Sequence, residues 1–125
     1  MNELDCFNDD EVLRLLMEGS AMIVENRECF IEKTSMGVHG CALGAMLAGF
    51  FGDATEALRA KEKAEREKCL IRFTYDGMVR WIAATVRVPF GFAKHIERLH
   101  YNDKSIAEIA RSIEQGEISI AQFTG

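Results

Sequence analysis

An uncharged stretch of 19 residues, Thr34 to Gly52, places the strongest constraint on how this chain folds. Its length alone would allow a membrane span. The stretch contains five glycines, however, and its strongly apolar part runs only from about Cys41 to Phe51. A run of that length predicts a helix buried in a protein core, so we expect no membrane span.

Small residues recur at every fourth position of this predicted helix, namely at Gly40, Gly44, Ala48 and Gly52. Residues four apart share one helix face, and a stripe of small side chains lets another backbone approach closely. Glycine in a helix costs about 1 kcal/mol relative to alanine. We therefore expect these glycines to serve packing.

The other apolar patterns predict a mainly α fold, a compact helical bundle of about five helices in a single domain spanning residues 1–125. Helical patterns cover residues 10–18, 41–51, 54–68, 78–86 and 90–99, with a last one from Ile106 to a stop at Gly116. Asp53 with Glu56 and Ser105 with Glu108 have the spacing of capping boxes. Asp76 is the expected cap of the helix that begins at Met78. The tail beyond Gly116 is expected to dock on the body.

Three segments are less determined by their pattern. Residues 21–33 hold two short apolar runs around a polar turn, which predicts a small β-hairpin or a second helix. Residues 69–73 end the preceding helix or form a short strand. Ser35 to Gly40 is expected to be a glycine-broken loop.

The net charge of −5 comes from 20 acidic and 15 basic residues and argues against a protein that binds nucleic-acid phosphates. The first 32 residues hold nine acidic and two basic side chains, so the acidity lies at the N-terminal end. We expect an unknown protein partner with a basic surface. The residues expected to contact it are Asp9, Asp10, Glu11, Trp81, Phe90 and Phe92.

A DNA-binding regulator is a weaker alternative. Residues 106–110 are similar to the first helix of a helix-turn-helix, but no Lys or Arg follows Arg111. We therefore expect no nucleic-acid partner.

The four cysteines, Cys6, Cys29, Cys41 and Cys69, lack the close spacing of metal-ligand pairs. We expect neither a metal site nor a cofactor. The acidic N-terminus does not have the pattern of an export signal, which predicts a cytoplasmic protein with reduced thiols.

The strongest candidate for chemistry is the triplet His39-Gly40-Cys41. A thiol in the first turn of a helix ionises more easily, and a neighbouring imidazole would assist it. An enzyme or small-ligand binder that uses this helix start is therefore the alternative function. No catalytic partner has a recognisable spacing, and His95 and His100, five apart, are interpreted as polar residues of a helix face or end.

The run Gly40-Cys41-Ala42-Leu43-Gly44 opens the apolar helix, Val88-Pro89 precedes the helix with Ile96 and Leu99, and Ser105 begins the last one. In these motifs the chain resembles a loose group of small, uncharacterised bacterial and prophage-type helical proteins. That resemblance implies a mainly helical domain encoded by a phage or mobile element, and it carries no named activity.

These patterns together favour a small acidic protein that acts by binding another protein, as a regulator or as a phage-encoded inhibitor of a host system. We also expect a homodimer, formed through the small-residue stripe or through the face from Met78 to Val86.

Overall fold

The computed structural model describes residues 7–67 and 74–123, and these residues form six α-helices and a small mixed sheet. The order is α1 (Asp9–Ser20), β1 (Val24–Glu25), β2 (Ile31–Thr34), β3 (Gly37–Gly40), α2 (Ala42–Phe51), α3 (Ala54–Glu67), α4 (Tyr75–Val86), α5 (Phe90–Asn102), α6 (Ile106–Glu114) and the 3-10 turn η3 (Ile120–Phe123). The predicted fold class, a mainly α domain, is confirmed. The predicted segment at residues 69–73 lies outside the described residues.

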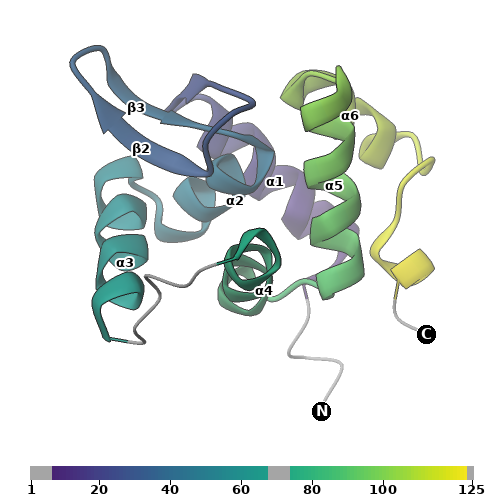
Figure 1. Cartoon of the computed structure of the whole chain (residues 1–125). Coiled ribbons are helices and arrows are strands. Elements are labelled where there is room, and N and C mark those ends of the chain that lie inside the picture. Colours follow the sequence, from purple (N-terminus) through teal and green to yellow (C-terminus); the bar gives the residue numbers. More distant parts are fainter. Residues whose placement is uncertain (1–6, 68–73, 124–125) are drawn as a thin grey trace.

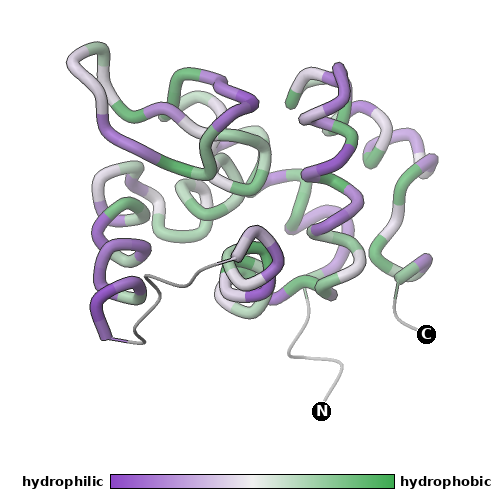
Figure 2. Tube along the Cα trace, viewed as in Figure 1, coloured by the Kyte–Doolittle hydropathy of each residue, from purple (hydrophilic) through white to green (hydrophobic). Residues whose placement is uncertain are grey.

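The apolar helix α2 lies at the centre of the molecule, and the other helices surround it (Figure 1). Every residue from Ala42 to Gly49 is buried, as the sequence predicts. Hydropathy follows this arrangement, because α2 is apolar along its length while α3 on the outside is largely hydrophilic (Figure 2). In the part of the chain that is described, no helix combines the length and apolarity that crossing a membrane requires.

The helices α1 and α2 touch through their backbones. A Cβ atom added at Gly19 of α1 would overlap the carbonyl oxygen of Ala45, and one added at Gly49 of α2 would overlap the carbonyl oxygen of Leu15. Each helix therefore has a glycine at the point where the backbone of the other helix contacts it. Because these glycines have no Cβ, the two helices pack closely, and Leu15 and the neighbouring Leu16 are fully buried.

The predicted stripe of small residues has a different partner from the one expected. Cβ atoms at Gly40 and Gly44 would meet the carbonyl oxygen of Phe30, which precedes β2 in the same chain. The stripe thus lets the sheet approach the start of α2. Both surfaces named for a homodimer are used within the chain, because these two glycines and the Met78 to Val86 face pack into the core.

The sheet corrects two sequence predictions. Residues 37–40, expected to be a loop, form the central strand β3, and the strand order is β1-β3-β2. Strand β2 pairs antiparallel with β3 and β1 pairs parallel with it, so each run within residues 21–33 contributes only in part to a strand, and the two strands do not form a hairpin with each other. The polar turn between the two runs fits a hairpin in its composition, but β1 and β2 both pair with β3, which follows them in the sequence.

The capping predictions are largely confirmed. Ser105 and Glu108 form a complete capping box at α6, and Asp53 accepts hydrogen bonds from two backbone N–H groups at the start of α3. The cap of α4 is Thr74 rather than Asp76, so that helix begins three residues earlier than predicted. The tail docks as expected, with the Phe123 ring 5.8 Å from that of Phe92.

We expect Gly19→Ala to lower the free energy of unfolding by roughly 3 kcal/mol, because the methyl group has to push α1 away from α2. Urea denaturation followed by circular dichroism measures the change. Gly91→Ala is the matched control, since its Cβ would lie 3.4 Å from the movable Phe123 side chain and the change should stay within about 1 kcal/mol. Equal stabilities of the two variants would contradict this account of the α1–α2 contact.

Candidate binding pocket

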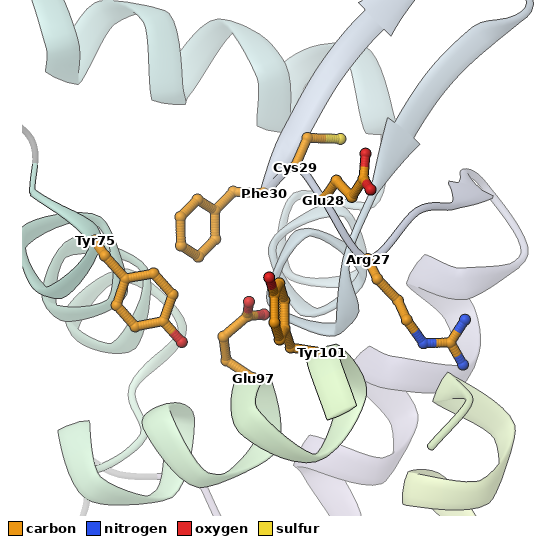
Figure 3. Close-up of a pocket in the computed structure, with 7 residues that line it drawn as sticks. All are labelled: Arg27, Glu28, Cys29, Phe30, Tyr75, Glu97 and Tyr101. Atoms are coloured by element: carbon orange, nitrogen blue, oxygen red, sulfur yellow. The ribbon is translucent and has the colours of Figure 1, made fainter. Parts of the chain in front are cut away.

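A pocket opens between the loop before β2, the first residue of α4 and the C-terminal half of α5. Its volume is about 110 Å³, and its lining residues are Arg27, Glu28, Cys29, Phe30, Tyr75, Glu97 and Tyr101 (Figure 3). Helix α5 places Glu97 at the base of the pocket, because residues 93, 96, 97 and 100 form its buried face. The pocket therefore joins an aromatic rim to a carboxyl group that points in from the core.

Glu97 is the unusual member of this set. The residue is only 4% exposed, and its Oε1 atom is buried without a hydrogen-bond partner among the described residues. Burial raises the pKa of the Glu97 carboxyl, while a hydrogen bond with the thiol of Cys41 acts in the opposite direction. An unpaired buried acceptor costs about 1–3 kcal/mol, so the position is unfavourable for stability alone.

Aromatic rings flank this carboxyl group on two sides. The Phe30 and Tyr75 rings lie 5.8 Å apart at an angle of 45°, and Tyr101 stands on the other side of Glu97 (Figure 3). Tyr75 is 47% exposed and Tyr101 is 64% exposed, so both rings face solvent as well as the pocket. Burial and the charge of Glu97 raise the pKa of Tyr75 to about 12, which keeps its hydroxyl protonated.

A fully paired polar cluster lies one turn further along α5. His100 is 0% exposed, its Nε2 lies 2.8 Å from Oε2 of Glu25, and its Nδ1 accepts a hydrogen bond from the backbone N–H of Ala42. Because Nδ1 is an acceptor, the ring proton is assigned to Nε2 and is donated to Glu25. The same Glu25 oxygen accepts from the backbone N–H of Ile106. The pair therefore satisfies first-turn N–H groups of α2 and α6.

Arg27 holds this cluster from the loop side. Its Nε donates to the carbonyl oxygen of His100 at 2.7 Å, and its Nη2 donates to that of Asp103 at 2.9 Å. The guanidinium consequently points away from the pocket (Figure 3). Burial lowers the pKa of His100, and Glu25 opposes this effect more weakly. His100 lies in the last turn of α5, as interpreted from the sequence, and its ring is buried in the core.

The structure places Cys41 at the N-cap of α2, as the sequence predicts, but 1% exposed. Burial, followed by the charge of Glu97, raises the pKa of the thiol well above its usual value, and the N–H groups of Gly44 and Leu43 only partly offset this. The expected easier ionisation is therefore reversed. His39 lies in β3 with its Nε2 buried and unpartnered among the described residues, and no hydrogen bond joins it to Cys41 there.

The predicted interaction residues differ in their burial and in the contacts they make. Asp9 accepts hydrogen bonds from the Ser119 hydroxyl and the Ile120 N–H, so it holds η3 against α1. Asp10 is exposed and Glu11 is half-buried. Trp81 and Phe90 are half-buried against the core, and the Arg80 guanidinium stacks over Phe90 at 4.0 Å. Phe92 is fully buried, so its prediction as a contact residue is wrong.

A second hollow of about 210 Å³ lies between α1 and α6 and is lined by Leu13, Met17, Ala107, Ala110, Arg111 and Glu114. It is larger than the Glu97 pocket, but among the described residues it contains no buried polar atom that lacks a partner. No group of three or more potential metal ligands occurs within residues 7–67 and 74–123. Of these two hollows, the Glu97 pocket is therefore the one whose lining includes a buried polar atom without a partner among the described residues.

The sequence contained one signal for this pocket. In α5 the buried positions follow helical spacing, and two of them carry polar side chains, Glu97 and His100. A polar residue at a core position of a helix indicates a buried network or a site. The aromatic partners from the loop and α4 had no such signal, since they come from distant parts of the chain.

Comparison of the chain with protein-family models, with curated proteins and with solved structures found no match.

We expect the free energy of unfolding to fall as the pH drops below about 6.5. In the unfolded chain His100 takes up a proton near its ordinary pKa, whereas the folded protein resists protonation because burial lowers the pKa of the ring. The Nδ1 atom also faces the Ala42 N–H. Stability is then complete above the unfolded pKa and is lost below it. Urea unfolding between about pH 5 and 8 measures this effect.

Glu97 acts with the opposite sign, because burial raises its folded pKa and its contribution to stability is lost as the pH rises through that pKa. The informative quantity is therefore the difference in the free energy of unfolding between the wild type and His100→Gln. That difference should shrink toward acid pH, while His95→Gln, which removes a partly exposed imidazole, should track the wild type. A difference that is constant with pH would overturn the assignment of a neutral His100.

Alkylation should separate the two described cysteines. We expect iodoacetamide to modify the half-buried Cys29 in the native protein, and to modify Cys41 only after unfolding in urea, because its thiol is buried and protonated. Peptide mass spectrometry assigns the label to each cysteine. Native modification of Cys41 at a rate equal to or above that of Cys29 would restore it as a nucleophile candidate.

Proposed function

We propose that this protein is a small acidic binding module of the cytoplasm that acts by recognising another protein, and that the Glu97 pocket receives one group of that partner. The observation that carries the proposal is the Oε1 atom of Glu97, a buried acceptor that no donor among the described residues pairs with, on a side chain that lines a hollow open to solvent. A ligand that brings a donor removes the cost of this unpaired atom on binding.

The rim of the pocket supports the same proposal. Exposed tyrosines are favourable contact residues, because a Tyr ring buries a large area and loses little conformational entropy. Tyr75 and Tyr101 keep much of their surface in water on either side of Glu97. Glu28 adds an acidic side chain at the entrance, which suits the basic partner that the charge distribution favours.

Nucleophilic chemistry at Cys41 is less well supported than binding. A thiol needs to ionise to attack a substrate, and burial raises the pKa of this one. The thiol instead interacts with the Glu97 carboxyl. In this proposal Cys41 supports Glu97 and does not react, and the resemblance to prophage-type proteins makes a bacterial host protein the expected partner.

Affinity capture from a bacterial lysate tests this function. The tagged full-length wild type should recover a partner at about 0.15 M salt, and Glu97→Gln should recover about ten-fold less, because a hydrogen bond to a charged group contributes about 1.5–3 kcal/mol. Glu117→Gln is the matched control, since it removes one exposed negative charge outside the pocket.

Thermal unfolding of the three proteins confirms that each variant is folded before capture is compared. Equal recovery of the same partner by wild type and Glu97→Gln would contradict a role for the pocket. Failure of the wild type to recover any reproducible protein would contradict the binding function itself.

A further inference from the structure

The Glu97 carboxyl lines the pocket and has one buried oxygen that no donor pairs with among the described residues. The carboxyl group interacts with the Cys41 thiol, and its Oε1 is buried without a partner among the described residues. A donor that carries a positive charge gains most from an ionised carboxylate, since charge-assisted hydrogen bonds are about twice as strong as neutral ones.

The walls of the pocket favour the same charge. The Phe30 and Tyr75 rings on one side and the Tyr101 ring on the other present aromatic surface around the carboxyl group (Figure 3). Aromatic faces attract cations within about 6 Å of the ring centroid. They also cover an alkyl chain that leads a charged end into a hollow.

The charged residues of the rim do not oppose a cation. Arg27 lines the pocket, but its guanidinium is committed to the carbonyl oxygens of His100 and Asp103 and points away. Glu28 contributes a second carboxylate at the entrance. A cation entering the pocket therefore meets an acidic and aromatic environment.

The acceptor geometry and the volume of the pocket distinguish among cations. A guanidinium forms its paired hydrogen bonds with two acceptor oxygens. The Glu97 carboxyl already interacts with the Cys41 thiol, and Oε1 is its buried oxygen that lacks a partner among the described residues. A quaternary ammonium has no N–H to donate. The volume of about 110 Å³ is well below the roughly 300–1,000 Å³ of sites for drug-sized ligands, so it fits the end of one side chain.

We infer that the Glu97 pocket binds a primary ammonium group on an alkyl arm, the chemistry of a lysine side chain, with the ammonium on Oε1 of Glu97 and the arm between Tyr75 and Tyr101. This inference rests on the proposed function, because it names the group that a partner inserts. A buried carboxylate under two tyrosines then recognises one lysine of a basic protein surface.

Binding at this site is coupled to a proton. Burial favours the neutral form of Glu97, and an incoming ammonium favours the carboxylate, so the Glu97 proton leaves to solvent while the ammonium keeps its own. Affinity therefore rises as the pH rises through the pKa of Glu97. The thiol of Cys41, at the N-cap of α2, interacts with this carboxyl. The other titratable or charged residues that line the pocket are Tyr75 from α4, Tyr101 from α5, and Glu28, Cys29 and Arg27 from the loop, and the Arg27 guanidinium points away.

An NMR titration of the full-length protein tests the inference, with n-butylammonium as the probe and guanidinium and tetramethylammonium as competitors at equal ionic strength. The ring signals of Tyr75 and Tyr101 should shift and saturate with n-butylammonium. Its affinity should exceed that of either competitor by about ten-fold, the factor expected for one charge-assisted hydrogen bond of about 1.4 kcal/mol or more. The affinity should also increase as the pH rises above the ordinary range of a Glu carboxyl, because burial raises the pKa of Glu97.

Variants separate the site from general effects of charge. Glu97→Gln should weaken n-butylammonium binding at least ten-fold and remove its pH dependence, whereas Glu117→Gln should bind like the wild type. Tyr101→Phe should keep the affinity and Tyr101→Ala should weaken it, since the ring face rather than the hydroxyl makes the contact. Because Tyr101 is exposed, these two variants and the wild-type pH profile decide the question even where Glu97→Gln fails to fold.

The outcomes distinguish this inference from the proposed function. Binding of guanidinium or tetramethylammonium as tightly as n-butylammonium, or binding that Tyr101→Ala leaves unchanged, overturns the ammonium site. An absent n-butylammonium response together with Glu97-dependent capture of a partner overturns the ammonium chemistry alone. Saturable n-butylammonium binding without any captured partner overturns the protein-binding function and leaves the site in place.

Discussion

The direct contact of backbones around α2 is the constraint on which the rest of the structure depends. Gly19 and Gly49 bring α1 and α2 together, and Gly44 admits the carbonyl oxygen of Phe30 on another side of α2. The second contact fixes where the loop before β2 crosses the start of the helix. Because Phe30 lies in that loop, the same close approach that packs the core also sets one wall of the Glu97 pocket.

Buried polar side chains meet at the N-terminus of α2. Its cap residue, Cys41, makes no side-chain capping bond, and the first helical N–H, on Ala42, is satisfied by His100 from α5. A helix end buried in this way needs polar groups from elsewhere in the chain. Helix α5 supplies them from one face, with His100 at the N–H and Glu97 one turn earlier beside the thiol.

The sequence predicted the parts of the structure that depend on local pattern. The buried helix at residues 41–51 was correct because apolar composition and length are local properties. Strand 37–40 was missed because its pairing depends on two other strands and its glycines resemble a loop. The lowered pKa predicted for Cys41 failed for the same reason, since burial is set by the whole fold. The polar core positions Glu97 and His100 were visible in the helical spacing, but their partners were not.

The two buried polar residues of α5 differ in a way that separates structure from function. Both ring nitrogens of His100 have hydrogen-bond partners, the Ala42 N–H and the Glu25 carboxylate, so its ring needs no ligand to be paired. Glu97 occupies the same face, but within residues 7–67 and 74–123 no donor pairs with its Oε1 atom, and this side chain lines an open hollow. If Glu97 served packing alone, an apolar side chain of similar size would avoid the unpaired acceptor. In the function proposed above, a donor supplied by a partner pairs with this atom.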